Sequence, residues 1–107
     1  MRETVALVLF DIPTGDRAMR RQYTHFLSGL KRLGYLMLQE SVYYKLLTNV
    51  STFSTEQRAV QRIAPTEGTV QFLPIPLGTF KKMTALTGRE FDMERLTAPI
   101  IEVGGEE

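Results

Sequence analysis

The most strongly patterned segment of the chain is an apolar run near its N-terminus. Residues Thr4–Phe10 are mostly aliphatic, include β-branched side chains, and show no alternation of polar and apolar positions. Such a run is typical of a strand that is buried on both faces. Pro13 and Gly15 end it, because proline lacks a donor for the strand ladder and glycine allows the chain to turn. We therefore expect the central strand of a sheet at Thr4–Phe10.

An amphipathic helix is predicted from Arg17 to Leu33, where apolar residues recur at steps of three and four. The apolar stripe consists of Met19, Tyr23, Phe26, Leu27, Leu30 and Leu33. Asp16 is expected to be the N-cap and Gly34 the C-cap. The opposite face carries Arg17, Arg20, Arg21, Thr24, Ser28 and Lys31, with Arg32 on its border. No acidic residue lies between Arg17 and Arg32, so this face is strongly basic.

The segment Tyr35–Leu47 is rich in aromatic and β-branched residues, but it is long for one strand. We expect a reversal near Gln39-Glu40-Ser41, which gives a hairpin of two strands. Tyr43 and Tyr44 alternate in the second of these, so one should enter the core while the other faces outward. A second helix is predicted at Ser54–Ala64, before Pro65.

Further strands are expected in the C-terminal third of the chain. Thr69–Ile75 has strand character, and Pro74 and Pro76 assign its far end to the edge of the sheet or to an exit from it. Lys82–Thr87 predicts another short strand. Pro99–Val103 is a last apolar patch and a candidate for an additional C-terminal strand.

This order of elements predicts an α+β fold of the ferredoxin-like split βαβ type (βαββαβ), in which both helices cover one face of an antiparallel sheet. We expect a single domain over residues 1–103 and a flexible acidic tail at residues 104–107. The other face of the sheet is expected to be exposed. Because the first strand is apolar on both faces, we infer a homodimer that is joined through sheet surfaces.

Composition narrows the class of protein. A chain of 107 residues has room for one core. The absence of cysteine excludes a disulfide framework and a thiolate metal site. The longest apolar run, Val5–Phe10, is too short for a membrane span, so we expect a cytoplasmic protein without membrane contact.

Charge is divided unevenly along the chain. Residues 1–89 hold 12 Lys/Arg and 6 Asp/Glu, which gives +6, whereas residues 90–107 hold 1 and 6, which gives −5. A basic body fits a polyanionic partner, although a solvated surface with an acidic, solubilising tail fits the charge equally well. The acidic segment Glu90–Glu94 is a candidate contact for a basic partner, with a flexible tail as the alternative.

Asp11 is the position that suggests chemistry most directly. A carboxylate at the end of a buried strand is costly unless something pairs with it. It could be a turn residue that accepts backbone N–H bonds. If instead a dimer axis passes near this strand end, two copies of Asp11 approach each other, and two charges ~4 Å apart repel by ~4 kcal/mol at an effective dielectric constant of ~20. Mg²⁺ or Mn²⁺ bound by Asp11 would relieve that repulsion and could act on a phosphodiester bond.

The basic helix face indicates a surface for phosphate groups. Side chains such as those of Arg17, Arg20, Arg21, Lys31 and Arg32 bind the backbone of a nucleic acid without reading its bases. The alternative is an ordinary solvated helix face. His25 lies on the flank between the two faces and is the only histidine, so we expect a surface residue rather than a metal ligand or part of a triad.

The ordered set of motifs resembles the CRISPR-associated protein two family. The motifs are Phe10-Asp11-Ile12-Pro13, the basic amphipathic helix, Gln39-Glu40-Ser41-Val42-Tyr43, and Phe80-Lys81-Lys82-Met83 with Gly88. The resemblance runs from about residue 4 to residue 103, and the variant found in type II systems is the most similar.

The resemblance implies a ferredoxin-like homodimer that bridges two dimers of the integrase subunit, CRISPR-associated protein one, and holds a short duplex DNA for insertion into the repeat array. Some members are described as metal-dependent endonucleases that act on RNA or DNA, with the aspartate at the end of the first strand binding Mg²⁺ across the dimer axis. That position is Asp11 here. The final strand of the family commonly joins the neighbouring protomer's sheet, as Pro99–Val103 could do.

Three hypotheses follow. The leading one is a non-catalytic, DNA-holding subunit of the spacer-acquisition complex. The second is a Mg²⁺-dependent endonuclease centred on Asp11; against it stands the small number of carboxylates, only Asp11 and Asp16, with no histidine base nearby. The third is a ferredoxin-like regulatory domain for a small ligand, which predicts no affinity for duplex DNA at low salt.

Overall fold

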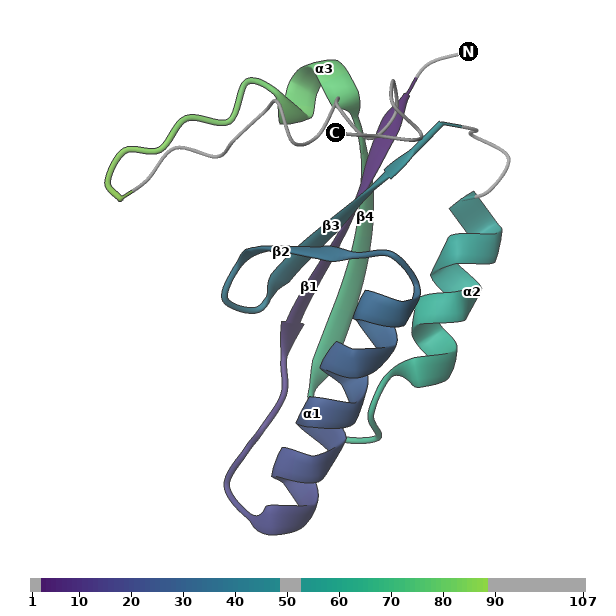
Figure 1. Ribbon diagram of the computed structural model, residues 1–107, viewed down its shortest axis with the longest axis vertical. Coiled ribbons are helices and arrows are strands. Elements are labelled where there is room, and N and C mark those ends of the chain that lie inside the picture. Colours follow the sequence, from purple (N-terminus) through teal and green to yellow (C-terminus); the bar gives the residue numbers. More distant parts are fainter. Residues whose placement is uncertain (1–2, 49–52, 89–107) are drawn as a thin grey trace.

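The computed structural model describes residues 3–48 and 53–88 (Figure 1). The elements are β1 (Thr4–Asp11), α1 (Arg17–Arg32), β2 (Leu36–Gln39), β3 (Val42–Leu47), α2 (Phe53–Ile63), β4 (Thr69–Pro76) and α3 (Leu77–Phe80). The four strands form one antiparallel sheet in the order β2-β3-β1-β4. The predicted α+β class is therefore confirmed, and the arrangement is consistent with the ferredoxin-like βαββαβ order.

Local signals set most of these boundaries. Asp16 caps α1, and its Oδ1 accepts a hydrogen bond of 2.8 Å from the Met19 backbone N–H. Ser41 has a φ of 68° at the reversal between β2 and β3, where a turn was expected. β4 lies at the edge of the sheet and includes both Pro74 and Pro76. An edge position was predicted because proline has no backbone N–H to donate to a neighbouring strand.

One predicted element is wrong. Lys82–Thr87 does not form a strand; the chain instead makes the short helix α3 directly after β4. Leu77 and Phe80 lie one turn apart in α3 and are both buried. The backbone N–H groups of Lys82 and Met83 donate to the carbonyls of Thr79 and Phe80, so they continue the turn and do not join the sheet. The candidate strand Pro99–Val103, the tail at residues 104–107 and the segment Glu90–Glu94 lie outside the described residues.

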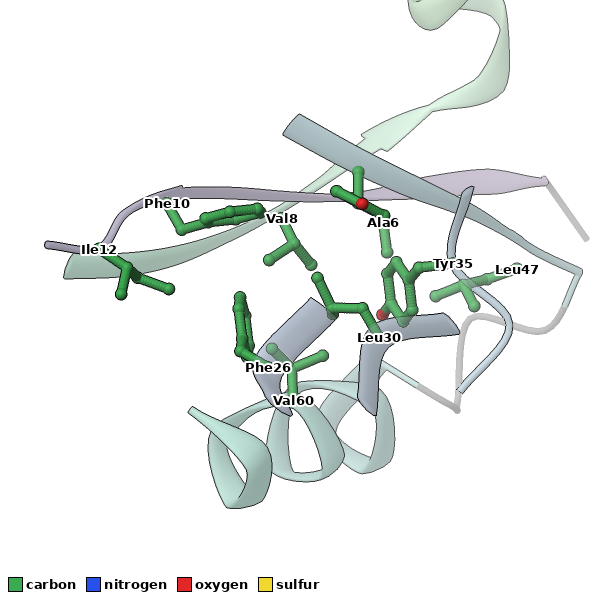
Figure 2. Packing of buried hydrophobic residues seen from close by; sticks show 10 residues of the cluster. Ala6, Val8, Phe10, Ile12, Phe26, Leu30, Tyr35, Leu47 and Val60 are labelled. Atoms are coloured by element: carbon green, nitrogen blue, oxygen red, sulfur yellow. The ribbon is translucent and has the colours of Figure 1, made fainter. Parts of the chain in front are cut away.

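The main core lies between the sheet and the two long helices. Alternate residues of β1, namely Ala6, Val8 and Phe10, point toward Phe26 and Leu30 of α1 and toward Val60 of α2 (Figure 2). The Phe10 ring packs edge to face on Phe26, with 5.1 Å between the ring centroids. This layer fixes α1 and α2 on one side of the sheet.

A second, smaller core occupies part of the other face. Val5 and Tyr44 pack there against Leu77 and Phe80 of α3. The expectation of a fully exposed second face is therefore wrong at this end of the sheet. The same contact corrects the prediction for the tyrosine pair: Tyr43 and Tyr44 are both buried, on opposite faces, because α3 covers the second ring.

A hydrogen-bonded network joins α2 to the sheet. Lys45 Nζ lies 2.8 Å from Glu56 Oε2 and donates a 2.7 Å hydrogen bond to the Leu33 carbonyl at the end of α1. Tyr35 donates its hydroxyl to Glu56 Oε1 over 3.1 Å. Burial, together with the Glu56 carboxylate, raises the pKa of Tyr35 well above its usual value. No helix among residues 3–48 and 53–88 is long and apolar enough to cross a membrane.

Tyr35 should make the protein sensitive to alkaline pH. Because the pKa of Tyr35 is raised in the folded state, the contribution of Tyr35 to the free energy of unfolding is complete below the unfolded pKa of about 10. Above that pH the unfolded chain loses the proton while the folded chain retains it, so the free energy of unfolding falls, by about 1.4 kcal/mol at pH 11. Urea unfolding of wild type and Tyr35→Phe at pH 8 and pH 11 measures this. The wild type should be more stable by about 1 kcal/mol at pH 8, and equal differences at both pH values would contradict the assignment.

Candidate functional site

Asp11 ends β1 with an exposed side chain. Its neighbours Phe10 and Ile12 belong to the core beneath the helices, so strand alternation directs Asp11 to the other face of the sheet. It faces Thr69 of β4 in the strand register. Sequence reasoning therefore located the residue correctly at the strand end, on the face that α3 covers only in part.

The loop before β4 holds this strand end by backbone contact. Gly68 has a φ of +94°, and a Cβ added there would lie 2.5 Å from the Asp11 carbonyl oxygen and 3.0 Å from Ile12 Cα. Only glycine allows both the left-handed conformation and this approach. The backbone at Asp11 is thus fixed by the fold.

A metal site cannot be completed by the described part of one chain. Among residues 3–48 and 53–88 no group of three or more His, Cys, Asp or Glu side chains could hold a metal ion. Asp16, the second carboxylate considered, serves as the α1 N-cap. Asp11 supplies an oxygen ligand of the type that Mg²⁺ prefers, so the cation predicted from the sequence would need ligands besides those of residues 3–48 and 53–88 of one chain, such as Asp11 of a second copy.

The five basic residues predicted on α1, Arg17, Arg20, Arg21, Lys31 and Arg32, are all exposed. Within the described residues the one ion pair is that of Lys45 with Glu56, so none of the five is neutralised by a carboxylate. They do not converge on a single point. Arg20 Nη1 donates to the Thr14 carbonyl over 3.4 Å on one flank of the helix, whereas Arg21 lies on the flank toward α2.

A groove of about 490 Å³ runs between α1 and the end of α2. We refer to it as the α1–α2 groove. Its basic lining is Arg21 and His25 of α1 with Arg62 of α2, and its apolar lining includes Ala18, Ile63 and Pro65. His25 is exposed, as expected, and its side chain lines the α1–α2 groove.

Sequence reasoning missed Arg62 as a candidate site residue. The available signal was weak: Arg21 and His25 stand four residues apart on one flank of α1, and Arg62 lies in the last turn of the helix that a split βαβ fold packs beside α1. Only the packing of the two helices brings these three side chains to one groove.

Part of the sheet face that carries Asp11 remains apolar and uncovered. Leu73 of β4 and Leu36 of β2 are 48% and 43% exposed. Leu7 and Leu9 of β1 lie between these two strands on the same face and are half-buried. We call these four leucines the open sheet face. An apolar patch of this kind across the face of a sheet is typical of an interface.

Comparison with known proteins identifies the family of this chain. The family described as CRISPR associated protein Cas2 matches residues 4–83. A CRISPR-associated endoribonuclease Cas2 of Campylobacter jejuni is 35% identical over 82 residues, which cover 77% of this chain and 57% of that protein. The protein of the same name from Acidovorax ebreus is 34% identical over 89 residues, which cover 83% of this chain and 87% of that protein.

The matched segment contains β1 with Asp11, all of α1, the β2–β3 hairpin, α2, β4 and α3. It therefore includes the whole described sheet and both faces discussed above. This chain spans little more than half of the Campylobacter jejuni relative but most of the Acidovorax ebreus one. On the extent of these matches, the chain belongs to the CRISPR-associated protein Cas2 family.

Proposed function

We propose that this chain is a homodimeric, nucleic-acid-binding subunit of the CRISPR spacer-acquisition complex, where it bridges dimers of the integrase subunit and holds the incoming duplex DNA. The observation that carries the proposal is the separation of two surfaces. The basic face of α1 lies on the outer side of the helix layer, and the open sheet face lies on the opposite side of the sheet. A dimer that forms through the sheet leaves both basic helices free for a phosphate backbone.

Dimerisation has a physical basis in the open sheet face. Leu7, Leu9, Leu36 and Leu73 expose apolar surface that a second copy would remove from water, at a gain of about 25 cal/mol per Å². α3 covers the neighbouring end of the same face and limits the free area to the part nearer Asp11. In such a dimer the integrase subunit would contact other surfaces.

Binding of nucleic acid rests on uncompensated positive charge. Among the described residues, no carboxylate pairs with Arg17, Arg20 or Arg21, which follow one another on the first turn and a half of α1. Side chains of this type release counterions from phosphates and give affinity without sequence specificity. This supports a duplex-holding role rather than recognition of a particular sequence.

A second candidate function is metal-dependent cleavage of RNA or DNA. The exposed Asp11 on the dimerisation face favours it, as do the relatives that are named endoribonucleases. Asp11 of each protomer would hold Mg²⁺ or Mn²⁺, and such an ion, when bound, polarises a phosphoryl oxygen or activates water. The α1 arginines lie on the other side of the sheet, so in this case they would contact other parts of the nucleic acid.

The basic face is tested by replacing Arg17, Arg20 and Arg21 together by Gln. Affinity for a short duplex should fall, and the slope of log K against log salt should flatten by about 0.9 for each phosphate that the variant no longer neutralises. A variant with Arg58, Lys81 and Lys82 replaced by Gln removes the same charge from other exposed positions and serves as the control. Equal reductions in the two variants would mean that only net charge matters.

The dimer is tested at the most exposed leucine of the open sheet face. Leu73→Glu should weaken association by about a hundredfold, because a carboxylate would be buried without a partner at a cost of about 3 kcal/mol. Leu86→Glu is the control, since Leu86 is 92% exposed and lies outside the sheet. Sedimentation equilibrium measures both, with far-UV circular dichroism as a check of folding. A wild type that is monomeric at micromolar concentration would remove the proposed dimer.

Asp11→Asn separates the two candidate functions. The amide keeps the size of the side chain but loses the charge that would bind a divalent cation. If the chain holds DNA without cleaving it, the variant should support spacer acquisition at the wild-type level. If Asp11 holds a catalytic cation, Mg²⁺-dependent cleavage of RNA or DNA should fall by at least about a hundredfold, while duplex binding in the absence of metal stays unchanged.

A further inference from the structure

The α1–α2 groove has no role in the dimer or at Asp11. It lies in the helix layer, on the far side of the sheet from the open sheet face. A sheet-to-sheet dimer would therefore leave it open to solvent. Its chemistry calls for a separate explanation.

The groove is lined by two arginines and by no acidic residue. Arg21, His25 and Arg62 contribute side-chain N–H donors, and none of the nine lining residues is acidic. Within the described residues neither arginine forms an ion pair. Arginine presents a planar fork of donors that matches the oxygens of a phosphate group, and apolar walls beside it strengthen the local field.

The groove is also held in shape at two points. At one end α1 and α2 touch: a Cβ added at Gly29 would lie 2.8 Å from Ile63 Cδ1, so the helices cannot come closer. Toward the start of α1, the Thr66 backbone N–H donates to Gln22 Oε1 over 3.3 Å and ties the loop after α2 to α1. Arg21 and Arg62 thus project from two elements whose spacing is fixed before any ligand binds, which reduces the entropy cost of binding.

We propose that the α1–α2 groove is a phosphate-binding site in which Arg21 and Arg62 grip the phosphate oxygens and His25 supplies a third contact. The phosphate could belong to a nucleic-acid backbone or to a free nucleotide. The groove volume of about 490 Å³ accommodates a phosphate with an attached sugar in either case. The assignment to a nucleic acid rests on the proposed function; the phosphate site itself does not.

His25 provides a direct reporter, because it is the only histidine of the chain. The imidazole NMR signals of the untagged protein are followed while sodium phosphate replaces sodium chloride at constant pH and ionic strength. The expected result is a saturable shift in wild type, an affinity at least about fivefold lower in Arg62→Gln, and wild-type behaviour in Arg58→Gln. Arg58 lies one turn earlier on α2 and outside the groove, so it controls for charge. No saturable shift, or equal affinity in Arg62→Gln, would overturn the proposal.

A second titration, with a short duplex, identifies the source of the phosphate. If the duplex displaces inorganic phosphate from the His25 reporter, and if Arg62→Gln lowers the salt slope of duplex binding by about 0.9, the groove contacts the nucleic-acid backbone. If the duplex binds without moving the His25 signals while phosphate still moves them, the groove serves free phosphate compounds. Phosphate binding without any duplex binding would contradict the proposed function but support the phosphate site. Duplex binding without phosphate binding would contradict the phosphate site but support the proposed function.

Discussion

The burial of β1 on both of its faces is the constraint from which the rest of the structure follows. Val5, Ala6 and Val8 have no solvent exposure; Ala6 and Val8 point to one side of the sheet and Val5 to the other. Each side must therefore be covered. The helices α1 and α2 pack on one side, whereas α3 covers only one end of the other. Leu7 and Leu9 stay only partly buried there, and this incomplete cover is the basis of the proposed dimer.

This arrangement separates association from ligand contact. In the proposed dimer the sheet would carry the apolar association, while positive charge is concentrated on the layer that faces away from it, on α1 and at the end of α2. Because the two surfaces lie on opposite sides of β1, a partner at one need not displace a partner at the other. Belonging to the CRISPR-associated protein Cas2 family gives this geometry a biological context without itself identifying partners.

Much of the fold was predictable because its signals are local. The apolar run of β1, the three- and four-residue steps of α1 and the reversal at Ser41 each depend on neighbouring residues. α3 was missed because its helix is stabilised by the packing of Leu77 and Phe80 on Val5 and Tyr44, a contact invisible along the chain. Arg62 was missed for the same reason, since its link to Arg21 exists only across the helix pair. The metal, partner and dimer predictions concern molecules beyond one chain and stay predictions.

Gly68 restricts substitution where the loop before β4 meets the end of β1. The loop that contains it is tied through Thr66 to α1 and presses its bare backbone on the strand end at Asp11. A contact between main-chain atoms cannot be adjusted by exchanging one side chain for a slightly larger one. Any other residue at position 68 would have to push the loop and the strand apart. Graded substitutions at this position therefore cannot adjust the distance between the loop and the strand end in small steps.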